Sequence, residues 1–181
     1  YPPSDNGPNS FRVGMAEDVL NLIALVRKQA GRPGPFERAN GGAIGLMGHS
    51  MGGGITLRVL VVDSEIDAAV LYGSVSADER ANYKRFGRDG SRPELSTPDA
   101  DMRRIAPLYF LRDIKAPVSI HHSVHDESVP YAWSEQLVDW LEALGKPYEF
   151  FTYANTPHTF RGEADQLFMQ RMSAFFDQHV D

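Results

Sequence analysis

The chain has 181 residues, of which 42% are hydrophobic and 23% charged, with a formal net charge of −6. This length and composition are typical of one globular domain with a substantial core, and the scattered basic residues argue against nucleic acid as a partner. The absence of cysteine excludes disulfides, thiolate metal sites and cysteine nucleophiles.

In the first part of the chain, hydrophobic periodicity and glycine boundaries predict alternating helices and strands. Residues 1–11 are rich in proline and turn formers and are expected to be a loop. Helical spacing of apolar residues predicts helices over 16–30 and 51–62. The short apolar runs 42–47 and 68–72 are typical of buried strands.

The rest of the chain continues the alternation after a polar, arginine-rich excursion over 76–113, which reads as a lid-like insertion within a single domain spanning 1–181. Its aromatic residues are expected to line or cover a substrate pocket: Tyr83, Phe86, Tyr109 and Phe110. Two further strands, 117–122 and 148–153, and two further helices, 130–144 and 163–179, are predicted. Their aromatic residues are expected to lie in the core: Trp133, Trp140, Phe168, Phe175 and Phe176. Strands that alternate with helices imply a parallel sheet with right-handed crossovers.

The strongest local motif is Gly48-His49-Ser50-Met51-Gly52, between a predicted strand and a predicted helix. A G-x-S-x-G sequence in that position is typical of a nucleophile elbow. The flanking glycines would let strand and helix approach closely, and the Met51 N–H at the helix N-terminus would stabilise an oxyanion. The alternative is a glycine-rich phosphate-binding turn, although neither GxxxxGK[ST] nor GxGxxG spacing is present.

A serine nucleophile needs a base and a carboxylate that orients it. Asp126 follows the third predicted strand and His158 follows the fourth, so both are expected at the sheet edge that carries Ser50. The alternatives are a turn or capping role for Asp126 and a plain loop histidine for His158. Other acids that could serve are, in order of preference, Glu127, Asp113 and Asp99.

A cluster of histidines, His121, His122 and His125, could suggest a metal site. Adjacent strand residues point to opposite faces, so His121 and His122 are not expected to ligate one ion. His49 is expected to pack or to contact a loop. No metal and no cofactor is predicted.

With these residues in place, the chain resembles the catalytic domain of prolyl-oligopeptidase-type hydrolases, which include acylaminoacyl and dipeptidyl peptidases, and related esterases and dienelactone hydrolases. The resemblance covers nearly all of the chain except 76–113 and is carried by these segments: DVLNLIALV, GLMGHSMGGGITL, IKAPVSIHHSVHDESVPYAWSEQLVDWLEALGK and PYEFFTYANTPHTF. It implies a three-layer α/β-hydrolase fold with a mostly parallel sheet, truncated to about its last four strands. It also implies Ser50 as nucleophile, His158 as general base and Asp126 as its partner.

Two departures from the family pattern matter. The turn before the acid reads Ser123-Val124 where relatives usually have glycine. The strand and loop that carry the second oxyanion donor in relatives precede Tyr1, so the chain could be a fragment, a minimal hydrolase or an inactive relative; we favour the fragment. Strand 42–47 would then have an open apolar edge, and we expect the chain to form a homodimer or to cover this edge in another way.

The predicted function is therefore hydrolysis of small esters by a Ser50–Asp126–His158 triad through an acyl-enzyme. Peptide hydrolysis and a non-catalytic interaction domain are the alternatives. No apolar run reaches the roughly 20 residues that span a bilayer, so no membrane association is expected, and the protein is placed in the cytoplasm by default.

Overall fold

The computed structural model describes residues 10–87 and 96–180 and contains an α/β fold with one parallel sheet. A short 3₁₀ helix, η1, opens the described chain at Ser10–Arg12. The remaining elements, in chain order, are α1 (Val13–Gln29), β1 (Gly45–His49), α2 (Met51–Leu60), β2 (Ala68–Tyr72), α3 (Glu79–Phe86), α4 (Asp99–Ile105), η3 (Pro107–Asp113), β3 (Val118–Ser123), α5 (Ala132–Ala143), β4 (Tyr148–Tyr153) and α6 (Glu163–His179).

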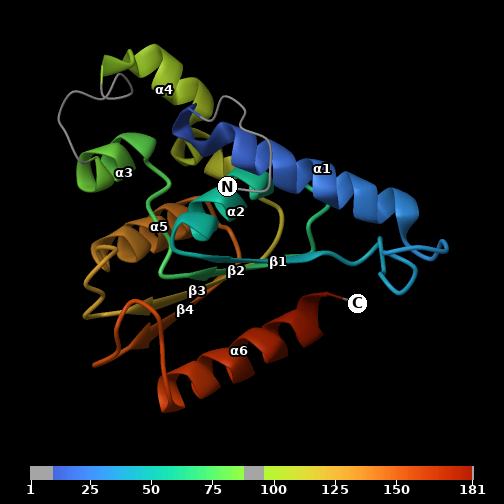
Figure 1. The fold of residues 1–181 in the computed structure, drawn as a ribbon. Coiled ribbons are helices and arrows are strands. Elements are labelled where there is room, and N and C mark those ends of the chain that lie inside the picture. Colours follow the sequence, from blue (N-terminus) through green and yellow to red (C-terminus); the bar gives the residue numbers. More distant parts are fainter. Residues whose placement is uncertain (1–9, 88–95, 181) are drawn as a thin grey trace.

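The sheet has the order β1-β2-β3-β4, and every pairing is parallel. Helices cover both of its faces: α1, α2 and α5 lie on one side and α6 on the other (Figure 1). This three-layer arrangement confirms the fold class expected from the sequence. Because the strands are parallel and each is next to its neighbour in the sequence, all four carboxyl ends meet at one edge.

Two separate apolar layers hold the helices to the sheet. Side chains of α1, α2 and α5 pack with one face of the strands around Leu57, Leu71 and Ile120, all of which are buried. On the other face, Phe168 and Phe175 of α6 pack against Val70 and neighbouring aromatic rings. The strands β2 and β4 and the helix α6 have the bounds predicted from periodicity. None of the helices in the described part of the chain has both the length and the apolar character needed to cross a bilayer.

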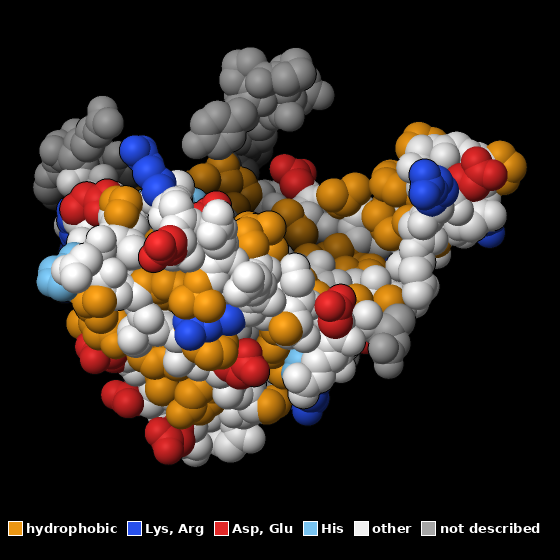
Figure 2. Space-filling model, turned by 90° about the horizontal axis from the view of Figure 1, so that it is seen from below, with side chains coloured by type: hydrophobic (Ala, Val, Ile, Leu, Met, Phe, Trp, Pro, Cys, Tyr) orange, Lys and Arg blue, Asp and Glu red, His pale blue; other side chains and the backbone are white. Residues whose placement is uncertain are grey.

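Strand β1 differs from the prediction in position and in burial. The side chain of Asn40 accepts a hydrogen bond from the Gly42 N–H at 3.0 Å, and this local turn delays the start of the strand to Gly45. Within the described residues β1 pairs with β2 alone, and Met47 is 49% exposed. The prediction of a buried strand is thus wrong, whereas the expected open edge is present. Figure 2 shows hydrophobic side chains gathered in the hollow between the main body of the molecule and the loop after α1, which projects beside it.

The excursion 76–113 contributes α3, α4 and η3, and its residues 88–95 lie outside the described residues. Its aromatic side chains do not gather in one place. Tyr83 is buried against Phe11, with ring centroids 4.9 Å apart, and Phe110 lines a groove between α1 and α2. Phe86 instead contacts Trp133 at the start of α5. Of these three side chains, Phe86 alone therefore lies beside α5, the helix that follows the loop of Asp126.

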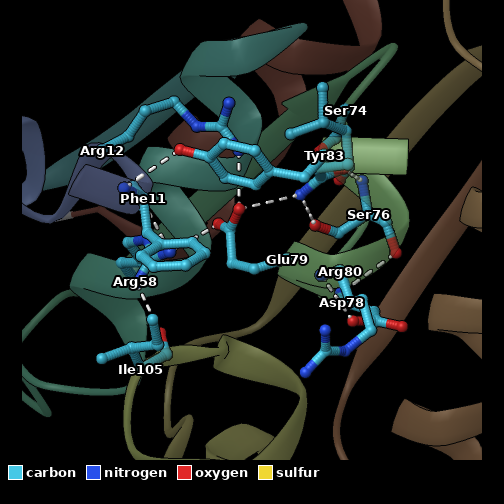
Figure 3. Close-up of polar contacts among 12 residues, drawn as sticks. Phe11, Arg12, Arg58, Ser74, Ser76, Asp78, Glu79, Arg80, Tyr83 and Ile105 are labelled. Carbon is cyan, nitrogen blue, oxygen red and sulfur yellow. Dashed lines mark hydrogen bonds and ion pairs between the residues drawn. The ribbon is translucent and has the colours of Figure 1, made fainter. Parts of the chain in front are cut away.

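A buried ionic cluster attaches α3 to α2 and to η1 (Figure 3). The Glu79 carboxylate accepts hydrogen bonds from Arg58 at 2.5 Å and from Arg12 at 2.6 Å. Arg58 also donates to the carbonyl oxygens of Phe11 and Ile105. The exposed fraction of the Glu79 side chain is 2%, and that of Arg58 is 8%. Glu79 therefore has its charge compensated inside the protein, at the junction of three elements.

Candidate active site

Ser50 occupies a strained turn between β1 and α2. Its backbone angles are φ 56° and ψ −118°, a conformation that side-chain-bearing residues rarely adopt and that costs about 1–3 kcal/mol. Neighbouring backbone groups hold it there. The Ser50 N–H donates to the Tyr72 carbonyl at 2.9 Å, and the Ser50 carbonyl accepts from Gly53 and Val75 at 3.0 and 3.1 Å. These are the features of a nucleophile elbow at the carboxyl end of β1.

The glycines of the motif serve different purposes. A Cβ atom at Gly48 would lie 2.4 Å from the Gly52 carbonyl oxygen, so a side chain there would collide with the turn. A Cβ atom at Gly52 would meet nothing within 4 Å, so the expectation that both flanking glycines permit close approach is wrong for Gly52. The close approach of α2 to the loop after β2 depends instead on Gly53 and Gly54, where a Cβ would lie within 2.3–2.6 Å of Ser74 or Val75.

Met51 is the first residue of α2. The first backbone N–H groups of a helix have no partner within the helix, and they carry the positive end of its dipole. The Met51 amide thus adjoins Ser50 at the place where an oxyanion donor is required. Its role in stabilising an oxyanion stays a prediction.

Asp126 and His158 are joined directly. The imidazole Nδ1–H of His158 donates to Asp126 Oδ2 at 2.7 Å, although the two residues come from different loops, after β3 and β4. The other carboxylate oxygen, Oδ1, accepts from the backbone N–H groups of Ser128 and Val129, both at 2.8 Å. Burial opposes ionisation of Asp126, but the hydrogen bond from His158 and those from the two amides outweigh it and lower the pKa of the carboxyl.

The neighbouring residues explain why Asp126, and not Glu127, faces the imidazole. Glu127 Oε2 accepts a hydrogen bond from the backbone N–H of His158 at 2.9 Å, so it holds the loop and leaves the ring to Asp126. The family departure at Ser123 has a structural counterpart. The Ser123 hydroxyl donates to the Thr156 carbonyl at 2.5 Å and so ties the loop that carries Asp126 to the loop that carries His158.

His158 contacts residues that adjoin Ser50 or its hydrogen-bond partner Tyr72. The ring of His49, one residue before Ser50, packs against the His158 ring with centroids 4.6 Å apart and the planes tilted by 30°. Gly73 directly follows Tyr72, whose carbonyl holds Ser50, and a Cβ at Gly73 would lie 3.0 Å from Cε1 of His158. No hydrogen bond between the Ser50 hydroxyl and His158 is present in the described part of the chain. Ser50 therefore lies beside residues that contact His158, and Asp126 and His158 are in direct contact.

Gly73 is a site residue whose importance sequence reasoning did not predict. Gly73 has a φ of +49°, and its missing side chain provides the space that the imidazole of His158 occupies. A glycine directly after a buried strand was the available signal. His49 packs between Tyr72 and His158, as expected for a packing role, and its Nε2 lies 3.4 Å from the His158 carbonyl oxygen. Burial and the nearby His158 lower the pKa of His49.

The adjacent histidines of β3 point to opposite faces, as predicted. His121 contacts Ser119 and Tyr153, and burial with the nearby Arg171 lowers its pKa to about 3. His122 faces α5 instead, where it contacts Ser134. In the described residues, no group of three or more histidine, aspartate or glutamate side chains is arranged to hold a metal ion.

Comparisons with known proteins identify the family and the fold. The model of the prolyl oligopeptidase family matches residues 37–181. Solved structures with the same fold include a puromycin-hydrolyzing peptidase from Mycobacterium tuberculosis (23% identity, TM-score 0.70, 91% of this chain and 25% of that chain) and an acylaminoacyl peptidase from Pyrococcus horikoshii (21%, 0.74, 94% and 28%). A third is a dipeptidyl peptidase 4 from Porphyromonas gingivalis (19%, 0.70, 93% and 23%).

The chain thus spans about a quarter of the length of these structural relatives. Comparison with curated protein sequences found no match. The family match covers well over half of the chain and includes the segments that carry Ser50, Asp126 and His158. The chain belongs to the prolyl oligopeptidase family.

Proposed function

We propose that the chain carries the catalytic residues of a serine hydrolase. Ser50 Oγ attacks the carbonyl carbon of an ester or amide while His158 Nε2 takes the hydroxyl proton. The tetrahedral oxyanion accepts a hydrogen bond from the Met51 N–H. His158 then protonates the leaving alcohol or amine, the acyl-enzyme forms, and a water molecule deprotonated by His158 releases the acid and restores Ser50.

The observation that carries this proposal is the 2.7 Å hydrogen bond from His158 Nδ1 to Asp126. It fixes the tautomer in which Nε2 is unprotonated and able to accept a proton. The strained turn at Ser50 and the packing of the adjacent His49 ring against His158 are independent support, because they belong to a different strand.

Labelling with a fluorophosphonate tests the nucleophile. Mass spectrometry of the labelled peptides is expected to find the adduct on Ser50 and to find none in Ser50→Ala. Ser173→Ala, which removes an exposed hydroxyl on α6, is the matched control and should label like the parent. A well-folded protein without label on Ser50 would contradict the proposal and favour a non-catalytic interaction domain.

We propose small acyl esters as the substrates, and peptides as the alternative. An amide needs a more effective proton donation to its leaving group than an ester does, because an amine is the poorer leaving group. The peptide alternative is supported by two of the structural relatives named above, the acylaminoacyl peptidase and the puromycin-hydrolyzing peptidase, because both are peptidases. Rates on p-nitrophenyl acetate and on an aminoacyl anilide separate the two; faster turnover of the anilide would reverse our preference.

For the open edge of the sheet we propose coverage by a second copy of the chain. The outer side of β1 is unpaired among the described residues, with Gly45 and Met47 exposed, and an unpaired apolar strand favours association. Light scattering is expected to find a dimer that Met47→Lys weakens. Val62→Lys, at an apolar position that is 68% exposed at the end of α2, is the control. A monomer at high concentration would contradict this proposal.

A further inference from the structure

His122 is a fully buried histidine that the reaction above does not use. It lies in β3, four residues before Asp126, and its exposed fraction is 0%. Its ring makes three polar contacts. Nδ1 lies 2.6 Å from the Ser134 hydroxyl, and Nε2 lies 3.2 Å from the Val129 carbonyl oxygen and 3.1 Å from Asp126 Oδ2. One side of the ring thus contacts α5, and the other contacts the loop of the catalytic acid.

These partners determine the tautomer of His122. The two groups beside Nε2 are a carbonyl and a carboxylate, and both only accept hydrogen bonds, so Nε2 carries the hydrogen. Nδ1 then accepts from the Ser134 hydroxyl. Burial lowers the pKa of His122 and outweighs the opposing effect of Asp126, so the ring is neutral. His122 therefore faces Asp126 as an uncharged N–H donor.

The Asp126 carboxylate is surrounded by donors as a result. Oδ1 accepts from the amides of Ser128 and Val129, and Oδ2 accepts from His158. The Nε2–H of His122 is shared: its hydrogen bond goes to the Val129 carbonyl oxygen at 3.2 Å, and Nε2 also lies 3.1 Å from Oδ2, the oxygen that accepts from His158. The Asp126 side chain is 1% exposed, so these protein groups take the place of water in holding it. A neutral donor holds the oxygen without a second positive charge that would compete with the His158 imidazolium.

We propose that His122 is a positioning residue for Asp126: held by Ser134, it fixes the carboxylate oxygen to which His158 is hydrogen-bonded. This inference rests on the proposed serine hydrolase function. The titratable groups that face His122 are Asp126 and, through its ring at 5.7 Å, Tyr131; Ser134 faces it from α5, and His158 lies beyond Asp126.

The first test is the pH dependence of hydrolysis in His122→Ala. Loss of a hydrogen bond to a charged group is expected to lower kcat about 10- to 100-fold with little change in KM. Without the N–H of His122, more negative charge remains on Oδ2, so His158 holds its proton more tightly and the acidic limb of the kcat/KM profile moves to higher pH. A residue needed only for packing would not move this limb.

The conservative variant His122→Gln places an amide N–H where Nε2–H was, and it should restore the limb and most of kcat. His125→Ala, which removes an exposed histidine beside Asp126, is the matched control and should resemble the parent. An unchanged acidic limb in His122→Ala, or His122→Gln no better than His122→Ala, would overturn the inference. If His122→Ala fails to fold, Ser134→Ala keeps the imidazole and should shift the limb in the same direction, by less; no shift there would also overturn it.

A second measurement does not depend on activity. Nitrogen-15 NMR of the histidine side chains is expected to find His122 as the neutral Nε2–H tautomer and a higher titration midpoint for His158 in His122→Ala than in the parent. If fluorophosphonate fails to label Ser50 while this shift is present, the proposed function is wrong and the coupling of His122 to Asp126 stands. If Ser50 is labelled but the midpoint is unchanged, only the role of His122 is refuted.

Discussion

Two buried carboxylates, Asp126 and Glu79, have opposite kinds of partner. Glu79 lies between the guanidinium groups of Arg12 and Arg58, which stay charged at every physiological pH. Asp126 lies between two imidazoles, those of His122 and His158, and an imidazole, unlike a guanidinium, can release its proton. Both side chains are almost completely shielded, at 2% and 1% exposure.

The difference lies in what the partners can do. The ions of the Glu79 cluster cannot move a proton to solvent or substrate, so this cluster can only join α2, α3 and η1. The Asp126 cluster ends in His158, whose side chain is 12% exposed at the rim of the sheet. The two clusters therefore differ in one respect that matters for the proposed function: an imidazole connects the buried carboxylate of Asp126 to the surface, whereas the partners of Glu79 are permanent cations.

The sharpest way to break this comparison is Asp126→Asn. The amide nitrogen would face Nδ1 of His158 and favour the wrong tautomer, so kcat is expected to fall about 10⁴-fold. The free energy of unfolding should change much less, since Asn can still accept from the amides of Ser128 and Val129. Steady-state kinetics with urea unfolding measures both. A large loss of stability with near-normal kcat would place Asp126 with Glu79.

Glu79→Ala is expected to have the reverse effect. It leaves Arg58 buried and without its carboxylate, which costs about 3–5 kcal/mol of the free energy of unfolding. Urea denaturation measures this loss. Asp99→Ala is the matched control, because the ion pair of Asp99 with Arg80 has the aspartate 85% exposed, and it should cost less than about 1 kcal/mol. Equal effects of the two variants would show that burial of the Glu79 cluster does not matter.

Gly73→Ala tests the space beside His158. The new Cβ would lie 3.0 Å from Cε1 of the imidazole and 3.4 Å from Asp126 Oδ2, so the ring must move, and a misplacement of this kind can cost about 10²-fold in rate. Gly145→Ala is the control for backbone strain, because its φ of +62° is similar and a Cβ there meets nothing within 4 Å. Both variants should lose similar stability in thermal unfolding, but only Gly73→Ala should lose activity.

The smallest effect is expected for Glu127→Gln. Glu127 accepts from the backbone of His158 in an exposed setting, and a glutamine oxygen can accept the same hydrogen bond. The rate should stay within about threefold of the parent, a change of under about 1 kcal/mol. This variant is also the charge-matched control for Asp126→Asn. A loss as large as that of Asp126→Asn would mean that the acid of the triad is misassigned.

Much of the fold and the order of the candidate triad could be predicted from the sequence, because they depend on local patterns. The spacing of apolar residues differs between the strand β4 and the helix α6, so each could be recognised from its own short segment of sequence. The alternation of strands and helices along the chain then implies a parallel sheet. In a parallel sheet the loops after the strands meet at one edge, so Asp126 and His158 could be placed together without coordinates. Their hydrogen bond confirms that placement.

The remaining features depend on contacts between segments far apart in the chain. Nothing near Glu79 in the sequence indicates that Arg12, 67 residues earlier, is its partner. The same holds for the role of Gly73, which is set by the arrival of His158 from another loop, and for His121 and His122, whose surroundings differ although they are adjacent. Local patterns determine which elements form and in what order, since they arise from backbone geometry and the burial of apolar faces. Which polar groups become partners was decided only by the tertiary structure, because packing sets the distances that hydrogen bonds and ion pairs require.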